Sequence, residues 1–173
     1  MSKNPIIHDL NKTVLTTPVH FLAFGFGSGL APFAPGTFGT LMAVPLYLLL
    51  SQLPLLGYLI ITLFISIVGV WICGKSSEKL GVHDHSGIVW DEFAGFLITM
   101  IMAPSGWFWI VMGFALFRLF DIWKPWPISL LDKKVKGGFG IMVDDILAGV
   151  FALFCLQLLN YSEVFSYFNS GLN

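Results

Sequence analysis

Charged residues are scarce in this chain of 173 residues. Asp, Glu, Lys and Arg make up 11% of it, whereas a soluble domain carries about 25%, and hydrophobic residues make up 56%. This composition indicates an integral membrane protein. The formal net charge is only −1, and this balance excludes a general nucleic-acid-binding protein, because affinity for the phosphate backbone requires a basic excess.

Cysteine is also rare, and the amino end lacks a leader-type apolar segment. Cys73 and Cys155 lie inside apolar runs without the spacing of metal ligands, so we expect both to be small buried hydrophobic residues. The first twenty residues contain scattered polar side chains and two prolines, unlike the uninterrupted apolar core of a signal peptide. We expect one domain over 1–173, with 1–17 as a cytoplasmic amino-terminal segment and 161–173 as a short tail.

Long uncharged runs are abundant, and their lengths predict membrane spans. A span needs about 20 apolar residues, and turn-forming residues at 51–54 and 103–106 divide the runs into segments of roughly this length or shorter. The predicted spans are 38–53, 55–74, two shorter ones between 93 and 117, and 141–160. We therefore expect an all-α, polytopic membrane helix bundle with about five transmembrane segments.

The positions of the basic residues predict the orientation of this bundle. All Lys and Arg lie within 3–12, 75–79 and 118–136, and the connectors at 51–54 and 103–106 contain none. Because Lys and Arg near the ends of spans favour the cytoplasm, we expect the amino end inside. This topology collects the polar stretches of the chain on the cytoplasmic face of the membrane, where we expect the active site.

Two similar segments, "DEFAGF" at 91–96 and "DDILAGVF" at 144–151, each begin with an acidic pair at the cytoplasmic end of a predicted span. A helix amino terminus stabilises a negative charge by about 0.3–1 kcal/mol, whereas a carboxylate inside the hydrocarbon costs about 2.5–3.5 kcal/mol. Two such pairs favour a functional site, with helix-end capping or structural ion pairing as the alternative. Adjacent helical residues differ by about 100°, so one member of each pair should bind the ligand and the other support it.

The acidic residues also indicate which ligand they bind. Carboxylates gathered without Cys and with few His suit a hard cation such as Mg²⁺, which prefers oxygen ligands and keeps waters that phosphates can replace. The candidate metal ligands and catalytic residues are Asp84, Asp91, Glu92, Asp121, Asp144 and Asp145.

Two basic residues lie close to one of these carboxylates. Arg118 and Asp121 are three residues apart and share a helix face, while Lys124 precedes Pro125, where the helix should end. One interpretation is an ordinary ion pair with a neighbouring surface lysine. The functional interpretation is that Arg118 and Lys124 bind a phosphate group.

Three further polar residues are candidates for phosphate binding, each with a simpler structural alternative. Thr37 follows Gly36 at the start of the first span, where a helix amino terminus could hold an anion, although a plain turn is an equally good interpretation. His83 and His85 flank Asp84, and such a triplet belongs either to the site or to a solvated loop.

Two other classes of membrane protein could use similar residues. A transporter also keeps carboxylates and broken helices at a cavity, but it places them near the membrane midplane, whereas here they collect at one face. A Mg²⁺-dependent lipid head-group enzyme of the CDP-alcohol phosphotransferase type requires a DG…AR…G…D…D series that this sequence lacks.

The chain resembles the bacterial phosphatidylglycerophosphatase A family over about residues 18–160. The resemblance rests on four motifs in the family's order, "GFGSGLAPFAPGTFGT", "GVHDHSGIVWDEFAGF", "FRLFDIWKPWPI" and "GGFGIMVDDILAGV". It implies an integral inner-membrane enzyme that depends on Mg²⁺ and hydrolyses the phosphomonoester of phosphatidylglycerophosphate to phosphatidylglycerol and phosphate. Direct attack by water and an aspartyl-phosphate intermediate both stay open, as do the oligomeric state and the tolerance for other lipids.

Overall fold

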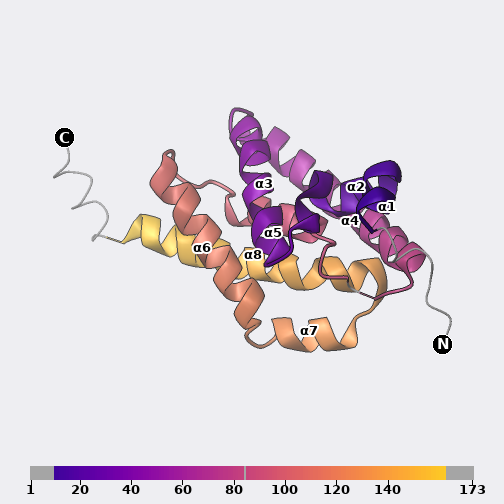
Figure 1. Ribbon diagram of the computed structural model, residues 1–173. Helices are drawn as coiled ribbons and strands as arrows, with labels where there is room; N and C mark the ends of the chain where they lie inside the picture. The colour runs from indigo at the N-terminus through magenta and orange to yellow at the C-terminus, as the bar shows by residue number, and fades with distance from the viewer. Residues whose placement is uncertain (1–9, 84, 163–173) are drawn as a thin grey trace.

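The computed structural model describes residues 10–83 and 85–162, and these residues form helices without any strand. Figure 1 shows their arrangement, with the long helix α8 running across the molecule, α6 crossing it and α7 alongside it. The helices are α1 (Leu10–Thr16), α2 (Pro18–Ala23), the 3₁₀ helix η2 (Gly25–Leu30), α3 (Pro35–Leu50), α4 (Leu55–Leu80), α5 (Trp90–Thr99), α6 (Trp107–Trp123), α7 (Ile128–Lys134) and α8 (Gly137–Tyr161).

The predicted all-α class is confirmed, and each of the five predicted apolar segments corresponds to one helix, α3, α4, α5, α6 or α8. The connectors predicted at 51–54 and 103–106 separate these helices as expected. The helices α1, α2, η2 and α7 were not predicted. Cys73 is buried as predicted, whereas Cys155 is only partly buried.

Two of the helices, α4 and α8, are long and apolar enough to cross a membrane, with mean hydropathies of 2.5 and 2.1 over their most apolar stretches. The apolar helix α3 is shorter. Helix α5 has only 10 residues, which give a length of about 15 Å, half of the roughly 30 Å hydrocarbon core. Helix α5 is therefore too short to cross a membrane by itself.

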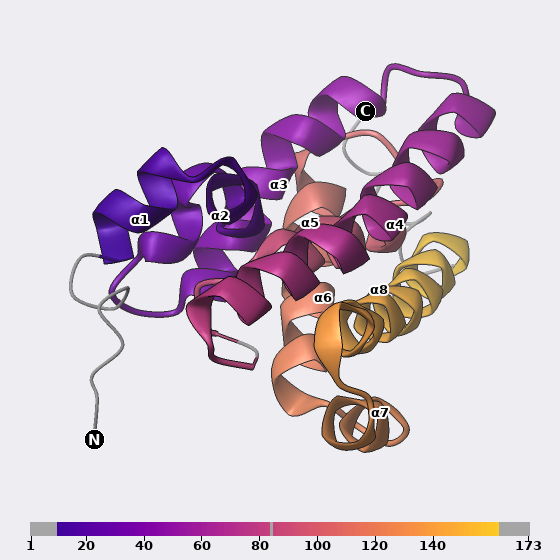
Figure 2. The same cartoon turned by 90° about the vertical axis from the view of Figure 1, so that its right-hand side faces the viewer.

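Helix α5 lies at the centre of the bundle, in contact with α3, α4, α6 and α8. Figure 2 shows it enclosed by these longer helices. All of its residues except Ile98 are buried, including the acidic Asp91 and Glu92 in its first turn. Protein rather than lipid therefore surrounds this short helix on nearly every side.

Two glycines allow α5 and α8 to pack unusually closely. A Cβ atom on Gly149 would overlap the carbonyl oxygen of Gly95, and one on Gly95 would come within 2.7 Å of the carbonyl oxygen of Asp145. Small residues permit such close approach of helices in membrane proteins. Asp91 and Asp145 each precede one of these glycines by four residues, about one helical turn. The two similar segments, 91–96 and 144–151, are thus the parts of α5 and α8 that contact each other.

We predict that Gly149→Ala destabilises the protein by about 1–3 kcal/mol, because overpacking a close contact forces backbone shifts. The matched control is Gly57→Ala on α4, where an added Cβ meets only ordinary contacts with Leu53. The control should be neutral or slightly stabilising, because Gly is unfavourable within a helix. Thermal unfolding in detergent measures both variants, and equal unfolding temperatures would contradict the proposed importance of the α5–α8 contact.

Candidate functional site

Three buried carboxylates from two helices form a compact cluster. Asp91 and Glu92 come from the first turn of α5, and Asp145 comes from α8. One oxygen of each side chain lies within 4.8 Å of the others, and the three residues are 8%, 8% and 3% exposed. Glu92 Oε2 is buried and has no hydrogen-bond partner among the described residues. This all-oxygen donor set, with an unsatisfied buried oxygen, fits a hard divalent cation.

The two acidic pairs occupy different positions on their helices. Asp91 and Glu92 lie at the amino end of α5, as predicted. Helix α8, however, begins at Gly137 rather than near 141, so Asp144 and Asp145 lie in its third turn. The stabilisation by a helix amino terminus acts within the first turn. The capping alternative is therefore wrong for the α8 pair.

The first turn of α8 makes a close contact with α4. A Cβ atom on Gly138 would overlap the carbonyl oxygen of Val70 and come within 2.8 Å of the backbone nitrogen of Gly74. Only a residue without a side chain permits this approach. The sequence alone did not reveal the contact, because Gly137 and Gly138 read as a turn before the helix.

The structure distinguishes the two adjacent aspartates of α8. Asp145 belongs to the carboxylate cluster with Asp91 and Glu92, whereas Asp144 Oδ2 accepts a hydrogen bond of 2.6 Å from Lys124 Nζ. The two side chains of this pair thus have different partners, and which of them binds a ligand stays a prediction. The pair on α5 is not divided in this way, because Asp91 and Glu92 both belong to the cluster. The other oxygen of Asp144, Oδ1, is buried without a hydrogen-bond partner within the described part of the chain.

Arg118 connects the cluster to helix α6. Its Nη1 atom lies 2.5 Å from Asp121 Oδ2 and 3.6 Å from Glu92 Oε1. The predicted ion pair with Asp121 is thus confirmed, and the side chain reaches the cluster as well. Its Nε atom is buried and has no hydrogen-bond partner among the described residues, so this donor could serve a bound anion.

Lys124 stands at the end of α6, where the sequence predicts that the helix stops. Helix α6 ends at Trp123, and Lys124 follows with a positive φ of 45°. Its Nζ atom donates to Asp132 at 2.7 Å and to Asp144 at 2.6 Å. Burial alone would lower the pKa of Lys124, but the hydrogen bonds and charges of the two aspartates outweigh it and raise the pKa above its ordinary value. The ammonium group therefore stays charged.

These side chains surround one pocket of about 320 Å³. It contains all the predicted acidic residues within the described ranges, together with Arg118 and Lys124. The start of α3 forms a wall, where a Cβ atom on Gly36 would overlap Glu92 Oε1 and come within 2.8 Å of Arg118 Nη1. The lining residues are Ala34, Pro35, Gly36, Ser86, Ile88, Asp91, Glu92, Arg118, Asp121, Ile122, Lys124, Asp144 and Asp145.

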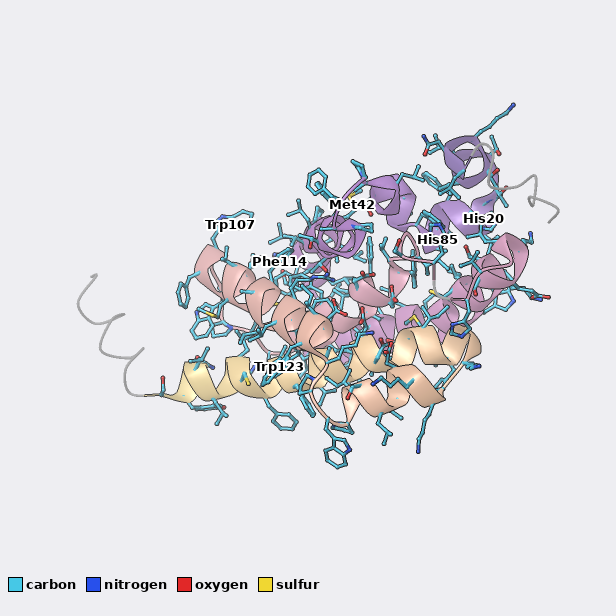
Figure 3. All side chains as sticks on the ribbon, turned by 60° about the horizontal axis from the view of Figure 1, so that its bottom comes forward. His20, Met42, His85, Trp107, Phe114 and Trp123 are labelled. Atoms are coloured by element: carbon cyan, nitrogen blue, oxygen red, sulfur yellow. The ribbon has the colours of Figure 1, made fainter. Side chains whose placement is uncertain are left out.

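The two candidate histidines do not line this pocket. The ring of His85 packs 5.5 Å from the ring of Phe24, and its Nδ1 accepts a hydrogen bond from the Gly87 N–H. Figure 3 places His85 on the same side of the bundle as His20 and the amino-terminal helices. His83 Nε2 accepts a hydrogen bond from the Gly137 N–H at 3.0 Å. Both rings thus have structural partners, and contact with phosphate stays a prediction.

Thr37 is likewise absent from the pocket lining, although its neighbour Gly36 is present. The Thr37 N–H donates to the carbonyl oxygen of Ala34 at 2.9 Å, so the helix turn already uses it. Asp84, a predicted metal ligand, lies outside the described residues.

The structure adds residues that the sequence did not single out. Asp132 from α7 holds Lys124, and Ser86 lines the pocket. Ser86 is polar and follows the candidate residue His85, and this position is a weak signal that could have indicated Ser86 as a site residue. Asp132 gave no such signal, because its ion pair with Lys124 depends on the turn at Pro125 and Pro127 that leads from α6 into α7.

Comparison with known proteins identifies the family. A family model described as phosphatidylglycerophosphatase A matches residues 21–160. The chain belongs to the phosphatidylglycerophosphatase A family. The matched range runs from α2 almost to the end of α8 and therefore includes every residue that lines the pocket. No solved structure matches the chain.

Relatives of this chain carry the family name. It is 45% identical over 148 residues to phosphatidylglycerophosphatase A of Escherichia coli, covering 85% of this chain and 86% of the relative. It is 47% identical over 154 residues to phosphatidylglycerophosphatase A of Haemophilus influenzae, covering 88% and 94%. A protein of Bacteroides thetaiotaomicron, provisionally named a phosphatidylinositol-3-phosphatase, is 39% identical over 146 residues, covering 79% and 90%.

We predict that Lys124→Ala lowers the free energy of unfolding by about 1–3 kcal/mol, because it leaves the buried Asp144 without its charged partner. Lys133→Ala is the matched control, since Lys133 lies exposed on the neighbouring helix α7 and should change stability little. Chemical or thermal unfolding in detergent compares the two. If both variants unfold at the same temperature, the ion pair of Lys124 with Asp144 does not stabilise the folded protein.

Proposed function

We propose that this protein is a Mg²⁺-dependent lipid phosphatase that hydrolyses the terminal phosphomonoester of phosphatidylglycerophosphate to phosphatidylglycerol and phosphate. The observation that carries the proposal is the pocket in which three clustered carboxylates face Arg118 and Lys124. Membership of the phosphatidylglycerophosphatase A family supplies the substrate. A phosphomonoester dianion and a divalent cation together match the charges of such a pocket.

We assign Asp91, Glu92 and Asp145 as the residues that hold Mg²⁺, because their oxygens lie close together and one of them is unsatisfied. When bound, Mg²⁺ neutralises charge on the phosphoryl oxygens and acts as a Lewis acid. We assign a different role to Asp121 and Asp144, because Asp121 forms an ion pair with Arg118 and Asp144 forms one with Lys124. These ion pairs position the two cationic side chains.

Arg118 and Lys124 bind the phosphate of the substrate in this proposal. Lys124 has three N–H donors, of which Asp132 and Asp144 take two, so one is left for a phosphate oxygen. Arg118 retains its Nε donor beside the ion pairs that its Nη1 makes. Both residues line the same pocket as the carboxylate cluster, so they would hold the reacting phosphorus next to the metal ligands.

The chemistry also needs a group that takes a proton from the attacking water. We assign this role to Asp144 Oδ1, a buried oxygen in the pocket without a hydrogen-bond partner within the described residues. Water would attack the phosphorus in line with the leaving alcohol. Trapping of a hydroxylamine-sensitive phosphorylated enzyme would overturn direct attack and favour an aspartyl-phosphate intermediate.

We place the pocket at the cytoplasmic side of a bacterial inner membrane, with the apolar helices crossing it. The distribution of Lys and Arg supports this orientation, and α4 and α8 have the length of membrane-spanning helices. The short helix α5 lies within the bundle, in contact with α3, α4, α6 and α8. A helix too short to span the membrane is tolerated there because protein shields its backbone from lipid.

We predict that Asp145→Asn lowers phosphate release from phosphatidylglycerophosphate at least about a hundredfold, because it removes a negatively charged ligand of the metal. The exposed Glu78→Gln on α4 is the control and should retain full activity. Purified proteins are assayed in mixed micelles with and without Mg²⁺. No release by the unmodified protein with metal present would refute the proposed function, and full activity of Asp145→Asn would remove this residue from the site.

Binding of Mg²⁺ can be measured without catalysis. We expect Mg²⁺ to raise the thermal unfolding temperature of the unmodified protein, because a ligand that binds only the folded state stabilises it. The rise should disappear in Asp145→Asn and persist in Glu78→Gln. An equal rise in all three proteins would show that the cation binds elsewhere.

A head-group panel tests the substrate, because a relative is provisionally named for a phosphatidylinositol phosphate. We expect phosphatidylglycerophosphate to be hydrolysed with a higher kcat/KM than phosphatidylinositol 3-phosphate. The reverse order would change the proposed substrate while leaving the phosphatase chemistry intact.

A further inference from the structure

Helix α6 carries a second hollow that the proposed chemistry does not use. It has a volume of about 580 Å³ and is lined by Ala115, Arg118, Leu119, Ile122 and Trp123. Arg118 is its only charged lining residue, and the remaining walls are apolar. Leu119, Ile122 and Trp123 are 52%, 70% and 69% exposed, so among the described residues no other helix covers this face.

The position of these residues on α6 explains the exposed apolar face. The opposite face of the helix, with Trp109, Ile110, Gly113 and Phe117, is buried against the bundle. Ala115, Leu119 and Ile122 follow the spacing of one helical face. Figure 3 shows Trp123 at the pocket end of α6 and Trp107 at the other end. The hollow therefore extends from the pocket along α6.

The hollow adjoins the pocket of the candidate site, because Arg118 and Ile122 line both. A molecule held in the pocket by its phosphate would therefore reach the apolar face by passing Arg118 and Ile122.

We propose that this α6 groove, formed by Ala115, Leu119, Ile122 and Trp123, binds an acyl chain of the lipid substrate while the head group occupies the pocket. The inference rests on the proposed function. A lipid phosphomonoester combines a dianion with long hydrocarbon chains, and the two connected hollows present the matching charged and apolar surfaces in that order. Other lipids compete for any exposed apolar surface, but the chain of a substrate already held by its head group is present at a high effective concentration.

The groove predicts a difference between the lipid and its deacylated head group. Ala115→Trp fills the groove with a bulky side chain, and Leu119→Ala removes part of its wall. Each should lower kcat/KM for long-chain phosphatidylglycerophosphate about tenfold, the effect of losing the contacts of about two methylene groups. The same variants should hydrolyse the deacylated head group, glycerophosphoglycerophosphate, within about twofold of the unmodified protein.

The matched control is Leu63→Trp, a bulky substitution at a position of α4 that is 60% exposed and lines neither hollow. It should leave both activities unchanged. Equal losses on the lipid and on the deacylated head group would overturn the inference, because they would indicate damage to the pocket. Unchanged activity of both groove variants on the lipid would overturn it as well.

A second measurement locates the chain directly and does not depend on turnover. A non-hydrolysable phosphonate analogue of the substrate, with a photoreactive group in one acyl chain, is crosslinked to the full protein. We expect labelling of residues 115–123 that excess unlabelled analogue displaces and excess phosphatidylethanolamine does not. Labelling that neither lipid displaces selectively, or that favours α4, would identify α6 as ordinary lipid-facing surface.

The two proposals fail in different ways. If the unmodified protein releases no phosphate from either substrate and the analogue does not compete, the proposed function is wrong. If it hydrolyses the lipid but the groove variants and the labelling behave like the controls, only the acyl-chain groove is wrong.

Discussion

The close contact between α5 and α8 is the interaction on which the rest of the site depends. Gly95 and Gly149 let the two backbones touch, and the acidic residues one turn earlier then meet in the cluster of Asp91, Glu92 and Asp145. A larger residue at either glycine would separate the helices. Without this contact the carboxylates would be isolated charges inside an apolar bundle, an arrangement with a high energetic cost.

Charge balance within this apolar surrounding is the second constraint. Among the described residues, the three clustered carboxylates, together with Asp121 and Asp144, share the pocket with two cationic side chains, Arg118 and Lys124. Buried ions of one sign repel strongly where water is absent. The proposed divalent cation would relieve this excess of negative charge and would make the pocket attractive to a phosphate.

Much of this arrangement was predictable from the chain. The five apolar segments, the connectors between them, the end of α6 before Pro125 and the pair of Arg118 with Asp121 all follow from local patterns. Local patterns did not predict the features that depend on contacts between helices. The close packing of Gly138 against α4 and the ion pair between Asp132 and Lys124 exist only once the helices have packed. The histidines of the loop and Thr37 do not line the pocket, although Thr37 directly follows the lining residue Gly36.

The sequence by itself determined the class of the protein, the residues able to carry the chemistry and the family, because composition, charge positions and motifs are properties of the chain. Only the tertiary structure decided which partner each member of the pair on α8 contacts. Asp144 and Asp145 are chemically identical and differ only in direction around α8, so their separate partners, Lys124 and the carboxylate cluster, exist only once the helices have packed.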